Sequence, residues 1–147
     1  MSKTKREKII IGRREVANLP QFGLMHVAVK VDSGAYTSSI HVSSCKEVEL
    51  EGATLLAVVF LDANHPSFDN ETHYFSDYRM KKVRSSTGQE QLRYFIFCTI
   101  DLVGQHIKTE FSLTERKGMR YPILLGRKLL NNRFLIDTSL KNTHTTT

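Results

Sequence analysis

The chain has no tryptophan, three prolines and two cysteines in 147 residues, and these scarcities narrow the class of protein. Two cysteines are too few for a secreted disulfide scaffold, so we expect Cys45 and Cys98 to be buried or half-buried free thiols in a cytoplasmic protein. A single disulfide is the alternative. No apolar stretch approaches the roughly 20 residues that cross a bilayer, and Ile9-Ile10-Ile11 is too short for the core of a signal peptide. We therefore expect one soluble domain without membrane contact.

The sequence also lacks the motifs of common cofactor sites. Neither cysteine belongs to a Cys-x-x-Cys pair, and the histidines form no His-Glu-x-x-His or comparable cluster. The glycine-rich loop that cradles nucleotide phosphates, ending in Gly-Lys-Ser or Gly-Lys-Thr, is missing as well. We therefore predict no zinc, no nucleotide and no other cofactor.

The net charge of +6 suits a polyanionic partner, because lysine and arginine beside phosphates release counterions. The positive residues are dispersed along the chain, and no nucleic-acid-binding motif contains them. An acidic peptide therefore fits this charge as well as RNA does. We expect no nucleic-acid partner and keep a basic RNA-binding barrel as a third hypothesis.

Strand-like segments dominate, because β-branched and aromatic residues often alternate with polar ones. Strands are predicted over Lys8–Gly12, Met25–Val31, Cys45–Leu50, Thr54–Leu61, Leu92–Leu102, Gln105–Leu113 and Phe134–Thr138. Glu51-Gly52 and Val103-Gly104 predict hairpin turns, and one short helix is predicted from Arg127 to Asn132. The pattern indicates an all-β protein but does not choose between a barrel and a sandwich.

We expect one domain at residues 9–140 between polar tails at 1–8 and 141–147. A polar stretch from Asp62 to Arg79 predicts a long surface loop. Its aromatic residues either shape a substrate groove or pack the loop onto the barrel. These aromatics are Phe68, Tyr74, Phe75 and Tyr78. Residues 82–89, with Gly88 in the turn, predict a hairpin tip that could serve as a flap.

The clearest chemical feature is a carboxylate that follows an apolar strand. Residues 28–31 run directly into Asp32-Ser33-Gly34-Ala35. A strand end is a poorly solvated place, Gly34 permits a tight turn, and Ser33 offers a hydroxyl for hydrogen bonding. A carboxylate held in this way can act as a general base. The same tripeptide is also common in ordinary turns, where aspartate accepts from nearby backbone amides.

A second apolar strand, Ile123-Leu124-Leu125, runs into Gly126-Arg127 and repeats the pattern. Together the two motifs resemble the bacterial retropepsin-like aspartic peptidase family, whose members also carry the label ATP-dependent zinc protease. The resemblance extends over residues 11–20, 30–41, 112–116 and 119–127, which span most of the chain. It implies a small retropepsin-like barrel of the acid protease type, closed or partly open, with one short helix after Gly126. The zinc and ATP parts of the label have no support in this sequence.

The resemblance implies that Asp32, Ser33 and Gly34 form the catalytic turn of an aspartic endopeptidase. Such an enzyme needs two carboxylates close together, because their repulsion leaves them sharing one proton. The chain contains one such turn, so a homodimer must supply the second Asp32 by symmetry. The polar tails lack the apolar alternation of a strong interface, which favours a weak or substrate-assisted dimer.

By the same resemblance Gly126 and Arg127 are structural. Five residues are the candidates for substrate binding: Ala35, Arg84, Gly88, Arg116 and Arg120. Arg116 and Arg120 could instead neutralise buried acids such as Glu115. The retropepsin arginine pairs with an acidic residue after the catalytic turn, but residues 36–39 contain none. We therefore expect Arg127 to pair with an acid elsewhere, with three candidates: Glu15, Asp101 and Asp137.

His41 follows a Thr-Ser-Ser-Ile run and is expected to be a hydrogen-bonded core or rim residue rather than a catalyst. The predicted function is hydrolysis of peptides, with acidic peptides as the candidate substrates. The alternative is a non-catalytic peptide-binding module on the same barrel.

Overall fold

The structure is a computed structural model that describes residues 7–84, 87–115 and 120–144. The first half of the chain forms β1 (Ile9–Ile11), β2 (Arg14–Leu19), the 3-10 helix η1 (Pro20–Phe22), β3 (Leu24–Val31), β4 (Ser38–Leu50) and β5 (Ala53–Phe60). The second half forms β6 (His73–Phe75), β7 (Arg79–Arg84), β8 (Glu90–Leu102), β9 (Gln105–Thr114), β10 (Ile123–Leu125), α1 (Arg127–Leu130) and β11 (Phe134–Ile136).

The main sheet closes on itself. Its strands follow the order β10-β3-β2-β8-β9-β4, and β10 pairs both with β3, in parallel, and with β4, antiparallel. β5 and β6 extend the sheet beyond β4, and β7 is added beside β8. The all-β fold, a small and partly closed barrel with one short helix after Gly126, is confirmed.

The barrel interior is apolar because alternate residues of each strand point inward. In β8, Ile96, Cys98, Ile100 and Leu102 are buried, whereas Phe97 between them is about half exposed. The largest fully buried side chain is Phe111 of β9. Both cysteines are free thiols, as expected, with Cys98 buried and Cys45 partly exposed. Burial raises the pKa of each thiol to about 12.

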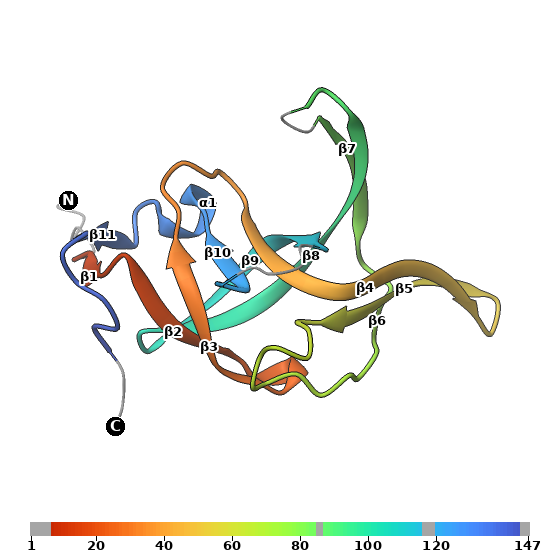
Figure 1. Ribbon diagram of the computed structural model, residues 1–147, viewed down its shortest axis with the longest axis horizontal. Helices are drawn as coiled ribbons and strands as arrows, with labels where there is room; N and C mark the ends of the chain where they lie inside the picture. The colour runs from red at the N-terminus through yellow and green to blue at the C-terminus, as the bar shows by residue number, and fades with distance from the viewer. Residues whose placement is uncertain (1–6, 85–86, 116–119, 145–147) are drawn as a thin grey trace, which may run out of the picture.

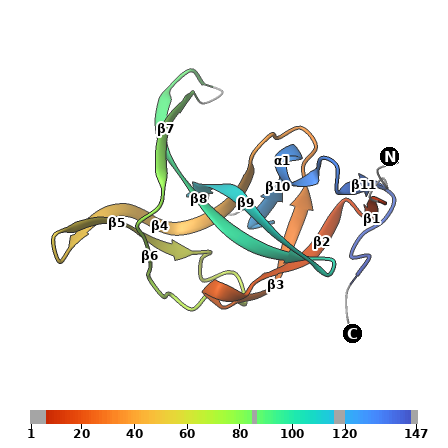
Figure 2. The same cartoon turned by 180° about the vertical axis from the view of Figure 1, so that it is seen from behind.

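Two long hairpins leave the barrel in different directions, β4–β5 and β7–β8 (Figures 1 and 2). The predicted turn Glu51-Gly52 joins β4 to β5, with φ angles of 51° and 80°. The predicted turn Val103-Gly104 joins β8 to β9, with φ angles of 45° and 79°. Positive φ at both central residues matches the right-handed twist of the paired strands, so both turn predictions are confirmed.

The structure contains strands that the sequence pattern did not predict. β2 is absent from the predicted set, β4 begins at Ser38 instead of Cys45, and β6 lies inside the predicted loop. The predicted helix to Asn132 ends at Leu130. The segment 79–84, predicted in part as a hairpin tip, is the edge strand β7 and pairs along its full length with β8. Ser85 and Ser86 of the predicted tip lie outside the described residues.

The loop aromatics mainly pack onto the barrel. The Phe75 ring lies 5.5 Å from that of Phe22 and 6.2 Å from that of Phe60. Phe68 and Tyr78 are partly buried against the same core, while Tyr74 is exposed. Of the two readings left open by the sequence, packing therefore holds for three of the four aromatics.

The two ends of the described chain lie together at one end of the barrel (Figure 1). β1 and β11 form a separate two-stranded parallel sheet. The buried carboxylate of Glu15 accepts hydrogen bonds from the Gly12 amide at 2.7 Å and from the Thr143 hydroxyl at 2.7 Å, which fastens residue 143 to the start of β2. No helix among the described residues is long and apolar enough to cross a membrane.

Candidate active site

Asp32 lies in a tight turn directly after β3. Its Oδ1 accepts a hydrogen bond from the Gly34 amide at 3.0 Å, and its carbonyl accepts one from the Ala35 amide at 3.2 Å. A Cβ added at Gly34 would lie only 3.3 Å from Oδ1 of Asp32, so the lack of a side chain at this position leaves room for the carboxylate. Asp32 is partly exposed, and Ser33 and Gly34 are exposed. The carboxylate therefore sits in a fixed turn that solvent and a ligand can reach.

The second glycine motif supports this turn from below. β10 runs between β3 and β4, the two strands that the turn joins, and the Asp32 amide donates to the Leu125 carbonyl at 2.9 Å. The Gly126 amide donates to the Ser38 hydroxyl at 3.0 Å. A Cβ on Gly126 would lie 2.8 Å from the carbonyl oxygen of Tyr36. The predicted structural role of Gly126 thus has a steric basis, since the turn backbone passes directly over it.

Arg127 does not pair with any of the three carboxylates expected for it. Its guanidinium donates to the Ser33 carbonyl at 2.9 Å and lies 5.7 Å from the centre of the Tyr36 ring. Glu15 is bound to Gly12 and Thr143, Asp101 contacts His106, and Asp137 accepts from Ser139. The expectation was wrong because a backbone carbonyl and an aromatic face take the place of an acid.

Lys128 continues the support of the turn on its other side. Its amide donates to the Tyr36 carbonyl at 2.9 Å, and its ammonium lies 5.5 Å from the Tyr36 ring. The same ammonium donates to Glu110 at 3.2 Å. Glu110 is almost fully buried and also accepts two hydrogen bonds from Arg79, at 2.7 and 2.8 Å. The hydrogen bonds from Arg79, and secondly from Lys128, hold the pKa of Glu110 below its usual value.

Cations gather on the outer face of the strand that leads to Asp32. Lys30 is exposed, stands two residues before Asp32 and pairs with Arg14 of β2 and Leu124 of β10. The Arg14 guanidinium donates to the Tyr121 hydroxyl at 2.6 Å, and its buried Nε has no hydrogen-bond partner among the described residues. Arg120 lies 5.7 Å from the Tyr121 ring centre.

The hydrogen bond from Arg14 and the charges of Arg14, Arg120 and Lys30 lower the pKa of the Tyr121 phenol. Among the described residues, no ion pair neutralises these three cations. This group of Arg14, Lys30, Arg120 and Tyr121, hereafter the cationic cluster, can therefore attract a carboxylate beside Asp32.

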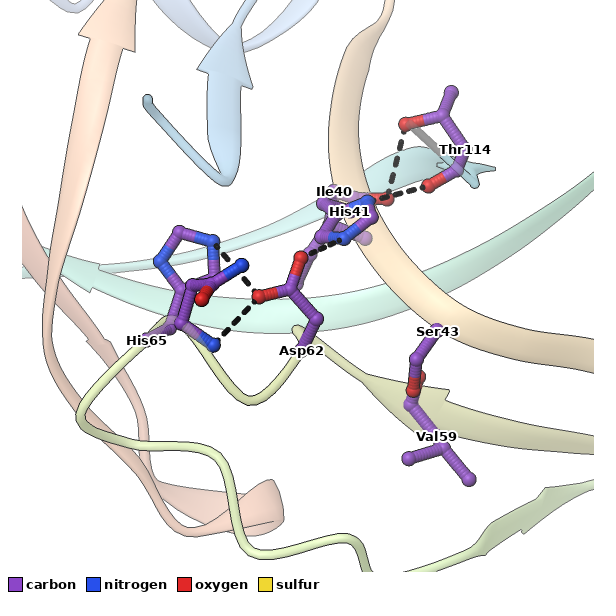
Figure 3. A network of polar contacts seen from close by, with 8 residues as sticks. Ile40, His41, Ser43, Val59, Asp62, His65 and Thr114 are labelled. Atoms are coloured by element: carbon purple, nitrogen blue, oxygen red, sulfur yellow. Dashed lines mark hydrogen bonds and ion pairs between the residues drawn. The ribbon is translucent and has the colours of Figure 1, made fainter. Parts of the chain in front are cut away.

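His41 is buried and hydrogen-bonded, as expected. Figure 3 shows its ring between Thr114 and Asp62: Nδ1 lies 3.2 Å from the Thr114 carbonyl oxygen and Nε2 lies 2.8 Å from the Asp62 carboxylate. Each ring nitrogen faces an oxygen acceptor. The Asn64 amide and, more weakly, His41 lower the pKa of Asp62.

The ring of His65 reaches the other oxygen of Asp62 at 3.9 Å. The His41 amide donates to the Pro122 carbonyl at 2.7 Å, next to the start of β10. The network thus fastens the long loop to the strands around the turn. Within the described part of the chain, no group of three or more His, Cys, Asp or Glu side chains is arranged to hold a metal ion.

The predicted substrate-binding residues are only partly brought together. Ala35 belongs to the Asp32 turn, and Arg120 belongs to the cationic cluster. Arg84 and Gly88 are exposed in the outer part of the β7–β8 hairpin, and no hydrogen bond or ion pair between described residues joins them to the turn. Arg116 lies outside the described residues.

Several residues of the site were missed by the sequence reasoning. Lys30 could have been found, because it lies two residues before Asp32 in the strand that runs into the turn. Glu110 and Lys128 had no such signal, because their contact joins β9 to α1 and has no local pattern.

Comparisons with known proteins agree with this geometry. The sequence model of a family described as RimB-like, retropepsin-like aspartic endopeptidase RimB, matches residues 10–147. Probable α-L-glutamate ligases from Shewanella pealeana and Shewanella halifaxensis are each 34% identical over 137 residues, which is 90% of this chain and 29% of theirs. The chain thus spans less than a third of these curated relatives.

A crystal structure of a protein of unknown function from Legionella pneumophila matches with a TM-score of 0.72 and 25% identity. The match covers 95% of this chain and all of the other. The family model matches nearly the whole chain, so the chain belongs to the RimB-like family of retropepsin-like aspartic endopeptidases.

Proposed function

We propose that this protein is an aspartic endopeptidase whose Asp32 acts in a pair formed across a homodimer. The observation that carries the proposal is the Asp32 turn. Leu125 and Gly126 hold this turn on one side, and its exposed residues leave it open to a ligand on the other. Membership in a family of aspartic endopeptidases supports the same activity. The free thiols of Cys45 and Cys98 fit a reducing compartment, and we propose the cytoplasm.

The chemistry follows from two carboxylates that share a proton. The ionised Asp32 takes a proton from a water molecule, whose oxygen attacks the peptide carbonyl carbon. The protonated Asp32 of the other subunit donates a hydrogen bond to the carbonyl oxygen and stabilises the charge that develops there. The proton then passes to the leaving nitrogen as the C–N bond breaks. The pair titrates as a unit, so neither role belongs permanently to one subunit.

Acidic peptides are the substrates that we propose. The cationic cluster includes Lys30 of β3, the strand that leads to Asp32, and three cations that form no ion pair with a described residue attract a substrate carboxylate. The names of the curated relatives support the same class, since a glutamate ligase produces glutamate-containing products. A peptide bond flanked by glutamate is therefore the proposed site of cleavage.

The proposal is tested by substituting asparagine for Asp32. Asp32→Asn keeps the size and most hydrogen bonds of the side chain but cannot accept a proton as a carboxylate does. Hydrolysis of an acidic peptide library, followed by mass spectrometry, should fall by roughly a thousand-fold or more, because the reaction loses its general base. Asp101→Asn is the matched control, since Asp101 contacts His106 near the β8–β9 turn. Unchanged hydrolysis in Asp32→Asn would refute the peptidase, and peptide binding without hydrolysis by the wild type would favour the binding module.

The choice of acidic substrates has its own test. Arg14→Met combined with Lys30→Met should raise KM for glutamate-rich peptides by roughly thirty-fold, with a smaller effect on uncharged peptides, because each of the two lost charge contacts is worth about 1 kcal/mol. Lys46→Met, which removes one positive charge from the β4–β5 hairpin, serves as a control for the effect of charge away from the cluster. Equal effects on acidic and uncharged peptides would show that the cationic cluster does not set the preference.

A further inference from the structure

A single buried carboxylate connects the β7–β8 hairpin to the support of the Asp32 turn. Glu110 projects from β9, is 3% exposed, and receives Arg79 from β7 on one side and Lys128 from α1 on the other. Arg79 is the first residue of the hairpin, and Lys128 lies directly after Arg127. Residues from three separate segments therefore meet on one side chain.

The contacts on both sides of Glu110 have defined geometry. Arg79 makes a bidentate pair, with Nε at 2.7 Å from Oε2 and the terminal nitrogen at 2.8 Å from Oε1. Its guanidinium also lies 5.0 Å from the centre of the Phe95 ring. A bidentate guanidinium on a buried carboxylate fixes both position and direction, unlike a single exposed ion pair. The base of the hairpin is thus held at a set orientation against β9.

The other side of Glu110 leads to the catalytic turn in two short steps. Lys128 shares Oε1 with Arg79, and its amide donates to the Tyr36 carbonyl. The preceding amide, that of Arg127, donates to the Ala35 carbonyl at 2.9 Å. Because Ala35 and Tyr36 follow Asp32 in the turn, a displacement of Lys128 is passed to the backbone that holds the carboxylate.

We propose that Glu110 is a positioning residue, which couples the orientation of the β7–β8 hairpin to the geometry of the Asp32 turn. The inference rests on the proposed function and deepens it. It gives the β7–β8 hairpin an effect on the Asp32 turn that passes through Glu110. A ligand that shifts β7 alters the Arg79 pair, and the shared oxygen then alters the Lys128 contact. Removing Arg79 leaves Glu110 a buried charge with one cation, which is unfavourable enough to rearrange its surroundings.

Amide hydrogen exchange measured by mass spectrometry tests this coupling directly. Arg79→Met removes the hydrogen bonds between the hairpin and Glu110 and changes no residue of the Asp32 turn. As a control, Lys81→Met removes an exposed cation from the same strand. We expect Arg79→Met to speed exchange in peptides that cover residues 33–38 and 126–130 roughly five-fold or more, the lower range of couplings between sites. Lys81→Met should leave both peptides at the wild-type rate. Exchange that rises only within residues 79–95 of Arg79→Met would overturn the proposal, because Glu110 would then anchor the hairpin alone.

A second variant covers the case in which Arg79→Met does not fold. Arg79→Lys keeps the charge but cannot form the bidentate pair, so exchange at the turn should rise above that of both the wild type and Lys81→Met. An exchange rate equal to that of the wild type would overturn the coupling.

Peptide hydrolysis adds a second measurement, because a purely structural role of Arg79 would not lower kcat selectively. In a folded Arg79→Met protein kcat should fall with little change in KM, because Arg79 acts on the turn and not on the substrate. A rise in KM alone would instead make Arg79 a substrate contact and contradict the positioning role. If the wild type hydrolyses no peptide, the proposed function fails, but the exchange measurement still decides whether Glu110 couples the two segments.

Discussion

Replacing Gly126 with alanine should destabilise the Asp32 turn. A Cβ at this position would lie 2.8 Å from both the Tyr36 oxygen and the Thr37 carbonyl carbon. Both atoms are backbone, so the contact cannot be relieved by rotating a side chain. Gly126 has φ of −97° and ψ of 176°, an extended conformation that alanine adopts freely, and the cost is therefore steric.

Overpacking of this kind costs roughly 1–3 kcal/mol. For a domain of this size each kcal/mol lowers the melting temperature by roughly 2–4 °C. The Gly126 amide also loses part of its hydrogen bond to the Ser38 hydroxyl as the backbones separate. We therefore expect Gly126→Ala to melt several degrees below the wild type and to lose most peptide hydrolysis, because the Asp32 turn must move away from β10.

Gly52→Ala in the β4–β5 turn is the matched control. Its φ of +80° makes alanine strained by roughly 1–2 kcal/mol, but no atom lies within 4 Å of the added Cβ. Gly52→Ala should thus lose comparable stability and keep wild-type hydrolysis. Thermal melts by circular dichroism and kcat/KM for an acidic peptide measure both quantities. The steric argument is refuted if Gly126→Ala matches the wild type in melting temperature and in activity.

Two further sets of substitutions and one thiol-labelling experiment test the structure. Phe111→Ala should lower the free energy of unfolding in urea by about 3–5 kcal/mol, because Phe111 is fully buried. Phe97→Ala, at a half-exposed position, should change it by about 0.5 kcal/mol or less. Equal losses would contradict the assignment of Phe111 to the barrel interior and Phe97 to its surface. Asp62→Asn should cost about 1 kcal/mol at neutral pH. Since the folded pKa of Asp62 is lowered, its stabilising effect is present above the unfolded value of about 3.9 and is lost as the pH falls through the folded value. The two proteins should therefore converge in acid, and a constant difference would contradict the lowered pKa. Cys45 and Cys98, whose pKa values burial raises to about 12, should react at pH 8 with a thiol reagent roughly a hundred-fold more slowly in the native protein than in urea. Rapid labelling of Cys98 in the native protein would contradict its burial.

The features that sequence reasoning found are those with a local signal. Glu51-Gly52 and Val103-Gly104 mark hairpin turns because few residue pairs accept two positive φ angles, and the structure has both. The Asp32 turn follows from an apolar strand that ends in Asp-Ser-Gly, and β10 from a second strand that ends at Gly126. In each case neighbouring residues carry all of the information.

β2 and the first half of β4, which were missed, carry polar side chains at buried positions. β2 places Glu15 inward, where the Gly12 amide and the distant Thr143 satisfy its carboxylate. β4 begins with Ser38 and also buries His41, so its first half does not read as apolar alternation. Each of these buried polar groups is hydrogen-bonded to a residue far along the chain, and the periodicity of a single segment cannot reveal such a partner.

The same reason limits prediction of the site. The resemblance to retropepsins suggested an acidic partner for Arg127, but the structure supplies the Ser33 carbonyl and the Tyr36 ring. The contact of Glu110 with Arg79 and Lys128 depends on the register of β8 with β9 and on where α1 packs. Such contacts follow from the closed barrel and not from any one segment.

The central claim is that two Asp32 carboxylates from different chains act together, and mixing wild-type chains with Asp32→Asn chains tests it most directly. At a constant total concentration of chains, with time for subunits to exchange, hydrolysis of an acidic peptide is measured against the wild-type fraction. A dyad requires two wild-type chains, so an equal mixture should retain about one quarter of the activity and the curve should be quadratic. A linear decline, with about one half of the activity in the equal mixture, would show that each chain works alone and would contradict the account.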